Sequence, residues 1–321
     1  MESNYLFLSF IISFTITSIL LIFSIPILRN LKVGQMVRED GPKTHLSKNG
    51  TPTMGGLIML IGYSITFILF GISFINLNVY EIFKFLFPCY IYLLIGFIDD
   101  LLIILKGNNK GLTPRVKIIM QVIGILIYFF VFLRNHSTII DLFYVKVDLK
   151  KFYFLFVLLI FVSSTNAVNL TDGLDGLASG TLIICFIATT ILGILYNNNS
   201  IVLFSVTIIA SLLSFLMFNY NPAKIFMGNA GSLMFGAVLS TVFIILNEEM
   251  FILIIGIVFI IETLSVIIQV IYFKITKGKR IFLMSPLHHH FEMKGYSEVS
   301  IDLLFWLIAL IASILLIFSL L

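Results

Sequence analysis

The sequence predicts an all-α, polytopic membrane protein with about ten transmembrane helices. Of its 321 residues, 60% are hydrophobic and only 11% are charged, whereas a soluble globular domain carries about 25% charged residues. Ten spans of about 20 residues would use roughly 200 residues, and the remaining loops are too short for a separate soluble domain of ordinary size. We therefore expect residues 1–321 to form a single integral membrane domain, and we exclude a water-soluble enzyme and a disordered chain.

Ten apolar runs separated by polar breaks mark the expected spans. They cover residues 5–28, 53–73, 82–98, 118–133, 152–165, 179–196, 201–218, 233–246, 251–272 and 301–321. The first run is long enough to cross a bilayer and no basic residue precedes it, so we expect an anchor rather than a signal peptide. Cys89 and Cys185 both fall within apolar runs and indicate neither a disulfide framework nor a metal site.

Basic residues predict the orientation of the spans. The loops that follow the odd-numbered spans contain fifteen of the 20 Lys and Arg residues: Arg29, Lys32, Arg38, Lys43, Lys48, Lys106, Lys110, Arg115, Lys117, Lys224, Lys274, Lys277, Lys279, Arg280 and Lys294. Cytoplasmic loops carry an excess of Lys and Arg. We therefore expect these loops to face the cytoplasm and both termini to lie outside.

Five polar segments lie on the same predicted face as the basic loops. They are residues 50–56, 99–100, 166–176, 227–232 and 286–292. A transporter would place such residues near the bilayer midplane. Their position at the ends of the spans instead indicates a site at the inner surface of the membrane.

Asp99 and Asp100 directly follow the apolar run 93–98. The pair has two interpretations, because two carboxylates at a helix end can form a solvated cap or bind a hard cation. Asp is costly at a bilayer boundary without a partner. Mg²⁺ binds through one or two carboxylates plus substrate phosphates, so the pair is a candidate magnesium site.

The segment 166–176 adds two amides and two carboxylates, on Asn166, Asn169, Asp172 and Asp175. If the segment is helical, Asn166 shares a face with Asn169, and Asp172 with Asp175. A helix N-cap followed by a glycine turn would explain one Asp, but not the whole run of side-chain oxygens. We therefore favour a binding site here.

Lys48 precedes a turn rich in Thr and Gly that contains Thr53. Lys and backbone N–H groups suit a phosphate, and glycine lets a ligand approach the backbone closely. The same residues also make an ordinary entry into a helix. The segment does not match a Walker A pattern, which excludes a P-loop NTPase.

The run His288, His289 and His290 is internal, so an expression tag is not expected. A zinc site would need further ligands, yet consecutive side chains diverge and neither cysteine is close in sequence. We favour phosphate binding or proton transfer by one imidazole that its neighbours orient. Together with the carboxylates and lysines, this predicts phosphoryl transfer, which needs mainly positioning and charge neutralisation.

Four segments, 50–56, 96–100, 166–178 and 286–292, resemble motifs of the bacterial phospho-N-acetylmuramoyl-pentapeptide transferases. That family belongs to the superfamily that transfers N-acetylhexosamine-1-phosphate to polyprenyl phosphate, and the triple-His motif separates it from its relatives. The resemblance covers essentially the whole chain. It implies ten helices in the bacterial inner membrane, with both termini periplasmic and the active site on cytoplasmic loops.

The resemblance also implies the reaction and its partners. Phospho-MurNAc-pentapeptide passes from UDP-MurNAc-pentapeptide to undecaprenyl phosphate within the lipid bilayer, giving lipid I and UMP with Mg²⁺ as cofactor. A homodimer is what the resemblance suggests, and nucleic acid is not an expected partner. The alternatives are a UDP-GlcNAc:polyprenyl-phosphate GlcNAc-1-phosphate transferase and an inactive variant that only binds.

The same resemblance implies roles for individual residues. Asp99 matches a carboxylate that deprotonates or orients the lipid phosphate, Asp100 its essential neighbour, and His289 the functional member of the triplet. Phe226 falls where an aromatic ring stacks on uracil, a contact worth about 1–3 kcal/mol. The expected lining of the substrate pocket is Lys48, Thr53, Asn166, Asn169, Asp172, Asp175, Gln269, His288 and His290.

Asn229 departs from the family pattern, which has an Asp that binds Mg²⁺ in the motif spanning residues 227–232. Asn keeps one acceptor oxygen but carries no charge. The expected metal ligands are thus Asp99, Asp100 and a weakened Asn229. We predict that the chain keeps its fold and its uridine pocket but turns over more slowly than Asn229→Asp, as measured by UMP release at saturating Mg²⁺.

Overall fold

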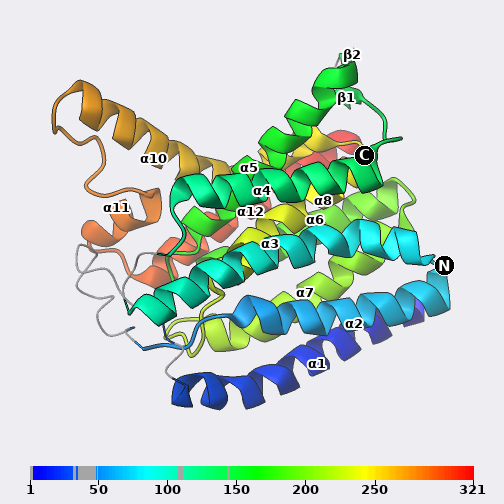
Figure 1. Cartoon of the computed structure of the whole chain (residues 1–321), viewed down its shortest axis with the longest axis horizontal. Coiled ribbons are helices and arrows are strands. Elements are labelled where there is room, and N and C mark those ends of the chain that lie inside the picture. Colours follow the sequence, from blue (N-terminus) through cyan, green and yellow to red (C-terminus); the bar gives the residue numbers. More distant parts are fainter. Residues whose placement is uncertain (1–2, 32–33, 35–47, 49, 108–110, 143–144) are drawn as a thin grey trace.

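The computed structural model describes residues 3–31, 34, 48, 50–107, 111–142 and 145–321. Within these residues, ten helices are long and apolar enough to cross a membrane, as predicted (Figure 1). They are α1 (Ser3–Asn30), α2 (Gly55–Ile75), α3 (Val79–Lys106), α4 (Pro114–Tyr128), α5 (Tyr153–Thr171), α6 (Leu177–Leu195), α7 (Asn199–Asn219), α8 (Gly228–Leu246), α10 (Ile257–Ile275) and α12 (Glu298–Leu320). The span of α4 includes the π-helical turn that continues it to Leu133.

Several helices, among them α3, α5 and α8, are longer than the apolar runs, because polar residues continue them. Helix α3 begins with a capping box in which the Asn78 side chain accepts from the Glu81 N–H, and it runs on to Lys106. Asp99 and Asp100 therefore lie inside a helix, whereas the sequence suggested its end. The predicted run 251–272 is interrupted at Gly256, which separates the short α9 (Ile252–Ile255) from α10.

Short elements connect the long helices. A π-helical turn (Phe129–Leu133) continues α4, and an antiparallel hairpin of β1 (Ile139–Asp141) and β2 (Lys146–Asp148) follows it, with Ile140 opposite Val147. The hairpin was not predicted. Two 3-10 turns (Lys150–Phe152 and Glu249–Phe251) precede α5 and α9, and α11 (Leu287–Met293) carries the three histidines.

Helix α8 forms the centre of the bundle. All of its residues from Ala230 to Ile244 are buried, and it packs against α2, α3 and α5. In contrast, α1, α10 and α12 expose many large apolar side chains, as expected for helices that face lipid. Small residues at helix contacts let backbones approach closely in a membrane protein, and α8 begins with Gly228, Asn229, Ala230, Gly231 and Ser232.

The two ends of the bundle differ. Both termini lie near the end that carries the β1–β2 hairpin, and α11 and the C-terminal end of α3 lie at the opposite end (Figure 1). The termini therefore share one side, as the even number of spans requires; that this side is the periplasm stays a prediction. Of the basic residues used for that prediction, Lys32, Arg38, Lys43 and Lys110 lie outside the described residues.

Gly96 determines how closely α3 approaches the start of α8. A Cβ atom on Gly96 would lie 2.1 Å from the Asn229 backbone oxygen and 2.5 Å from the Ala230 Cα. Backbone atoms at that distance cannot turn aside as a flexible side chain does. This contact places Asp100, one turn further along α3, against the first turn of α8.

Gly96→Ala is therefore expected to lower the melting temperature and the activity, because overpacking costs about 1–3 kcal/mol. The control is Gly124→Ala on α4, where the added Cβ would meet a side-chain methyl group, the Ile91 Cγ2 at 2.7 Å, rather than backbone. Thermal unfolding of both variants in the same detergent measures the difference. Equal melting temperatures for the two variants would contradict the role given to Gly96.

Candidate active site

Asp100 reaches the N-terminus of α8 and is held there by three hydrogen bonds. Its Oδ1 accepts from the Asn229 backbone N–H (3.1 Å) and from the Asn229 Nδ2 (2.8 Å), and its Oδ2 accepts from the Ala230 N–H (3.0 Å). The first N–H groups of a helix lack intrahelical partners and favour an anion. The chain enters α8 through Gly228 at a φ of 74°, where a Cβ would lie 2.7 Å from both Asp100 Oδ2 and Thr53 Oγ1.

Asn169 continues this network from α5. Its Nδ2 donates to the Asn229 Oδ1 (2.7 Å) and to the Ser232 Oγ (2.8 Å), so hydrogen bonds lead from Asn169 through Asn229 to Asp100. Asn166 does not join them, although it is one turn away on the same helix. Its Nδ2 donates to the Gln121 Oε1 (3.0 Å) on α4 and to the backbone of α5.

Asp99 faces a different set of partners. Its Oδ2 lies 2.5 Å from the Lys117 Nζ on the first turn of α4, and its Oδ1 accepts from the Leu112 N–H (2.6 Å). The Asp99 carboxylate is buried, whereas 17% of the Lys117 side chain is exposed. The pair therefore consists of a buried carboxylate that holds the ammonium group of a partly exposed lysine side chain in place.

Lys48 and Asp175 pair directly. The Lys48 Nζ lies 2.7 Å from Asp175 Oδ1 and 2.6 Å from the Glu298 Oε2 at the start of α12. Asp175 Oδ2 in turn accepts from the Ala223 N–H (2.9 Å) and from the Asn221 Nδ2 (3.3 Å). These contacts fix the ammonium group of Lys48 beside the turn that joins α5 to α6.

Asp172 and Asp175 do not share a helical face, which corrects the sequence expectation. Helix α5 ends at Thr171 and α6 begins only at Leu177, so both carboxylates lie on the connecting turn. Burial, followed by the negative charges of Asp100 and Asp175, raises the pKa of Asp172 to about 7.

The three histidines on α11 point to three different partners, as their adjacency predicted. His288 is fully buried, with Nδ1 3.1 Å from the Glu262 Oε2 on α10, and its backbone N–H donates to Glu262 Oε1 (3.2 Å). The His289 Nδ1 lies 2.6 Å from Glu292, and the His290 Nδ1 accepts from the Leu283 N–H (3.1 Å).

His288 also connects the histidine segment to the α5–α6 turn. Its Nε2 is buried and has no hydrogen-bond partner among the described residues. A Cβ atom on Gly173 would lie only 2.4 Å from this nitrogen. The turn that holds Asp172 and Asp175 therefore contacts His288 through Gly173 and Lys48 through Asp175.

Gln269 binds the loop after α10, and Phe226 binds the segment before α2. The Gln269 amide binds the loop after α10, accepting from the Ile281 and Phe282 N–H groups and donating to the Phe282 oxygen, each at 3.0 Å. The backbone of Phe226 pairs with Pro52 on the segment that contains Thr53. Stacking of Phe226 on a base stays a prediction.

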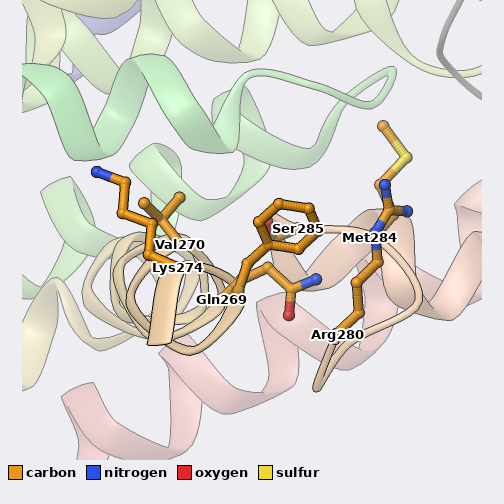
Figure 2. Close-up of a pocket in the computed structure, with 7 residues that line it drawn as sticks. Gln269, Val270, Lys274, Arg280, Met284 and Ser285 are labelled. Carbon is orange, nitrogen blue, oxygen red and sulfur yellow. The ribbon is translucent and has the colours of Figure 1, made fainter. Parts of the chain in front are cut away.

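Gln269 also lines a pocket of about 380 Å³ between α10 and the loop that follows it. Figure 2 shows the Gln269 amide between α10 and the segment that carries Arg280 and Met284. The remaining lining residues are Val270, Phe273, Lys274 and Ser285. The pocket thus combines apolar side chains with two cations.

The comparisons identify the family of the chain. A family model described as glycosyl transferase family 4 matches residues 82–247. The chain is 48% identical over 311 residues to the phospho-N-acetylmuramoyl-pentapeptide-transferase of Staphylococcus saprophyticus subsp. saprophyticus, covering 95% of this chain and 96% of that protein. The proteins of the same name from Staphylococcus carnosus (46% over 310 residues; 95% and 96% covered) and Geobacillus sp. strain WCH70 (44% over 321 residues; 98% of both) are also similar. The chain belongs to the phospho-N-acetylmuramoyl-pentapeptide transferase family.

Sequence reasoning missed three residues of the site in this member of the phospho-N-acetylmuramoyl-pentapeptide transferase family. Lys117 was used only to predict topology, and Glu298 was not singled out. Glu262 had a detectable signal, since it is a lone carboxylate within the apolar run 251–272, and a charge inside a span is rarely placed there without a function. The partners of all three come from distant segments.

Proposed function

We propose that the chain transfers phospho-MurNAc-pentapeptide from UDP-MurNAc-pentapeptide to undecaprenyl phosphate, giving lipid I and UMP at the cytoplasmic face of the bacterial inner membrane. The names of the similar transferases support the reaction. The observation that carries it here is that Lys48, Lys117 and His288 each pair with a carboxylate. They lie just before α2, at the start of α4 and on α11, and these parts of the chain lie at one end of the bundle (Figure 1). A soluble donor and a lipid acceptor can meet there.

The geometry suggests how these residues act on the two phosphates. An oxygen of the lipid phosphate attacks the sugar-bound phosphorus of the donor, and the bond to the uridylate oxygen breaks, so that UMP leaves. Phosphoryl transfer needs positioned positive charge more than covalent chemistry. Lys117, held by Asp99, and Lys48, held by Asp175, supply fixed cations for the phosphates. Participation of Mg²⁺ and a homodimer both stay predictions.

Product analysis with purified protein in lipid nanodiscs tests the proposal. We expect UMP and a lipid-linked product from UDP-MurNAc-pentapeptide and undecaprenyl phosphate, and no product from UDP-GlcNAc. Product from UDP-GlcNAc alone would favour the GlcNAc-1-phosphate transferase. Donor binding without any lipid-linked product would favour a protein that only binds.

We further propose that the acceptor lipid lies along α10 and places its phosphate near the pocket beside Gln269. Apolar side chains of α10 are exposed, and Lys274 and Arg280 line the pocket. Hydrogen bonds to charged groups contribute about 1.5–3 kcal/mol. The double variant Lys274→Ala/Arg280→Ala should therefore raise the KM for undecaprenyl phosphate at least tenfold without changing the KM for the donor.

Steady-state kinetics with each substrate varied in turn measures this effect. The control is Lys279→Ala, which removes a nearby exposed charge that does not line the pocket. If the double variant raised the KM for the donor instead, the pocket would bind the donor and not the acceptor lipid.

A further inference from the structure

Asn229 lies between Asp100 and Asn169, and the chemistry of its neighbours fixes its orientation. A carboxylate can only accept hydrogen bonds, so the group of Asn229 that faces Asp100 Oδ1 at 2.8 Å is the NH₂ group. Its Oδ1 faces the other way and accepts from the Asn169 Nδ2 at 2.7 Å. Each polar atom of the Asn229 side chain is therefore engaged.

This arrangement does not fit a preformed Mg²⁺ site. Magnesium demands oxygen ligands in near-ideal octahedral geometry at about 2.0–2.1 Å, whereas residue 229 turns a nitrogen toward Asp100. Both Asp100 oxygens already accept N–H groups from the first turn of α8, and both Asp99 oxygens are engaged by Lys117 and Leu112. In the described part of the chain, no group of three or more His, Cys, Asp or Glu residues is arranged to hold a metal.

We infer that the Asn229 amide takes the place of a cation at Asp100, so that this chain completes the contact between α3 and α8 without a protein-bound divalent ion. The Asn229 amide donates a hydrogen bond to Asp100, whereas a carboxylate at position 229 would repel the Asp100 carboxylate. An Asp at position 229 would bring two carboxylate oxygens to about the present 2.8 Å separation. Like charges that close need a shared proton or a cation between them.

Metal binding and thermal stability test this inference without substrates. Binding of Mn²⁺ alone is measured from the electron paramagnetic resonance signal of the free ion. Thermal stability is measured as the melting temperature in EDTA and in Mg²⁺. The variants are Asn229→Asp and, as a matched control, Asn247→Asp, which makes the same change on an exposed residue at the other end of α8.

The unchanged protein should bind no more Mn²⁺ than Asn247→Asp, and its melting temperature should not respond to Mg²⁺. Asn229→Asp should bind one Mn²⁺ ion at least tenfold more tightly than the unchanged protein does. Its melting temperature should be lower than that of the unchanged protein in EDTA and should rise again in Mg²⁺. Stoichiometric Mn²⁺ binding by the unchanged protein would overturn the inference, and this measurement decides even if Asn229→Asp fails to fold. Neither readout needs turnover, so the outcome is separate from that of the proposed function.

Discussion

Lys117→Met is expected to lower kcat by about 10²–10³-fold, the usual cost of removing one positioned group that stabilises transition-state charge. The substitution keeps the apolar stem of the side chain and removes only the ammonium group. That group lies 2.5 Å from Asp99 Oδ2 on a side chain that is 17% exposed, and we expect it to contact a bound phosphate. Initial rates of UMP release measure the effect, and the melting temperature shows whether the fold is kept.

A double-mutant cycle separates the two members of the pair. Asp99→Asn should also lower kcat strongly, because Lys117 then loses its ion-pair partner. If the pair acts as a unit, the double variant should be no slower than the slower single variant, since effects of residues that act together are not additive. Arg115→Met, on the same turn of α4 and exposed, is the control and should keep kcat within threefold. An unchanged kcat for Lys117→Met would show that Lys117 has no role in the mechanism.

The sequence alone predicted the bundle well because bilayer thickness determines the length of each apolar run. The ends of the helices were less predictable, since polar residues continue a helix when tertiary contacts satisfy them. Asp99 and Asp100 illustrate this: they follow an apolar run, yet α3 continues to Lys106 because α4 and α8 provide donors to both carboxylates. The break at Gly256 and the β1–β2 hairpin are too short for hydrophobic periodicity to reveal.

The residues of the candidate site were easier to predict than their pairing. Polar residues at span ends are rare in so apolar a chain, so Asp100, Asn169 and Asp175 were identifiable from position and type. Their partners come from segments far away in sequence: Asn229 lies 129 residues after Asp100, and Glu298 lies 250 residues after Lys48. No local pattern specifies such contacts. Packing of α3 against α8 brings Asp100 to Asn229, and the contact of Lys48 with Glu298 likewise depends on the tertiary fold.

We propose that His288, which Glu262 orients, is the imidazole of the triplet that transfers a proton. The second large effect is therefore expected from Glu262→Gln, which should lower kcat by about 10²–10⁴-fold, the range typical of a positioned acid–base group. Glu262 is fully buried and accepts from both the His288 backbone N–H and the ring. A carboxylate can only accept, so the Glu262 carboxylate holds a proton on the His288 Nδ1, and the Nε2 of the ring is directed toward Gly173. Glutamine can donate its NH₂ to Nδ1, which places the proton on Nε2 and reverses the tautomer.

The pH dependence of kcat separates this positioning role from a structural one. Glu262→Gln keeps the shape of the side chain, so its melting temperature should stay close to that of the unchanged protein while its pH–rate profile changes. Glu262→Ala, in contrast, breaks a buried pair, which costs about 3–5 kcal/mol, and should lower the melting temperature. The control is Glu81→Gln at the exposed start of α3, where glutamine can also complete a capping box. If Glu262→Gln kept both kcat and the pH–rate profile, the pair would serve only to hold α11 against α10, and His288 would have no part in proton transfer.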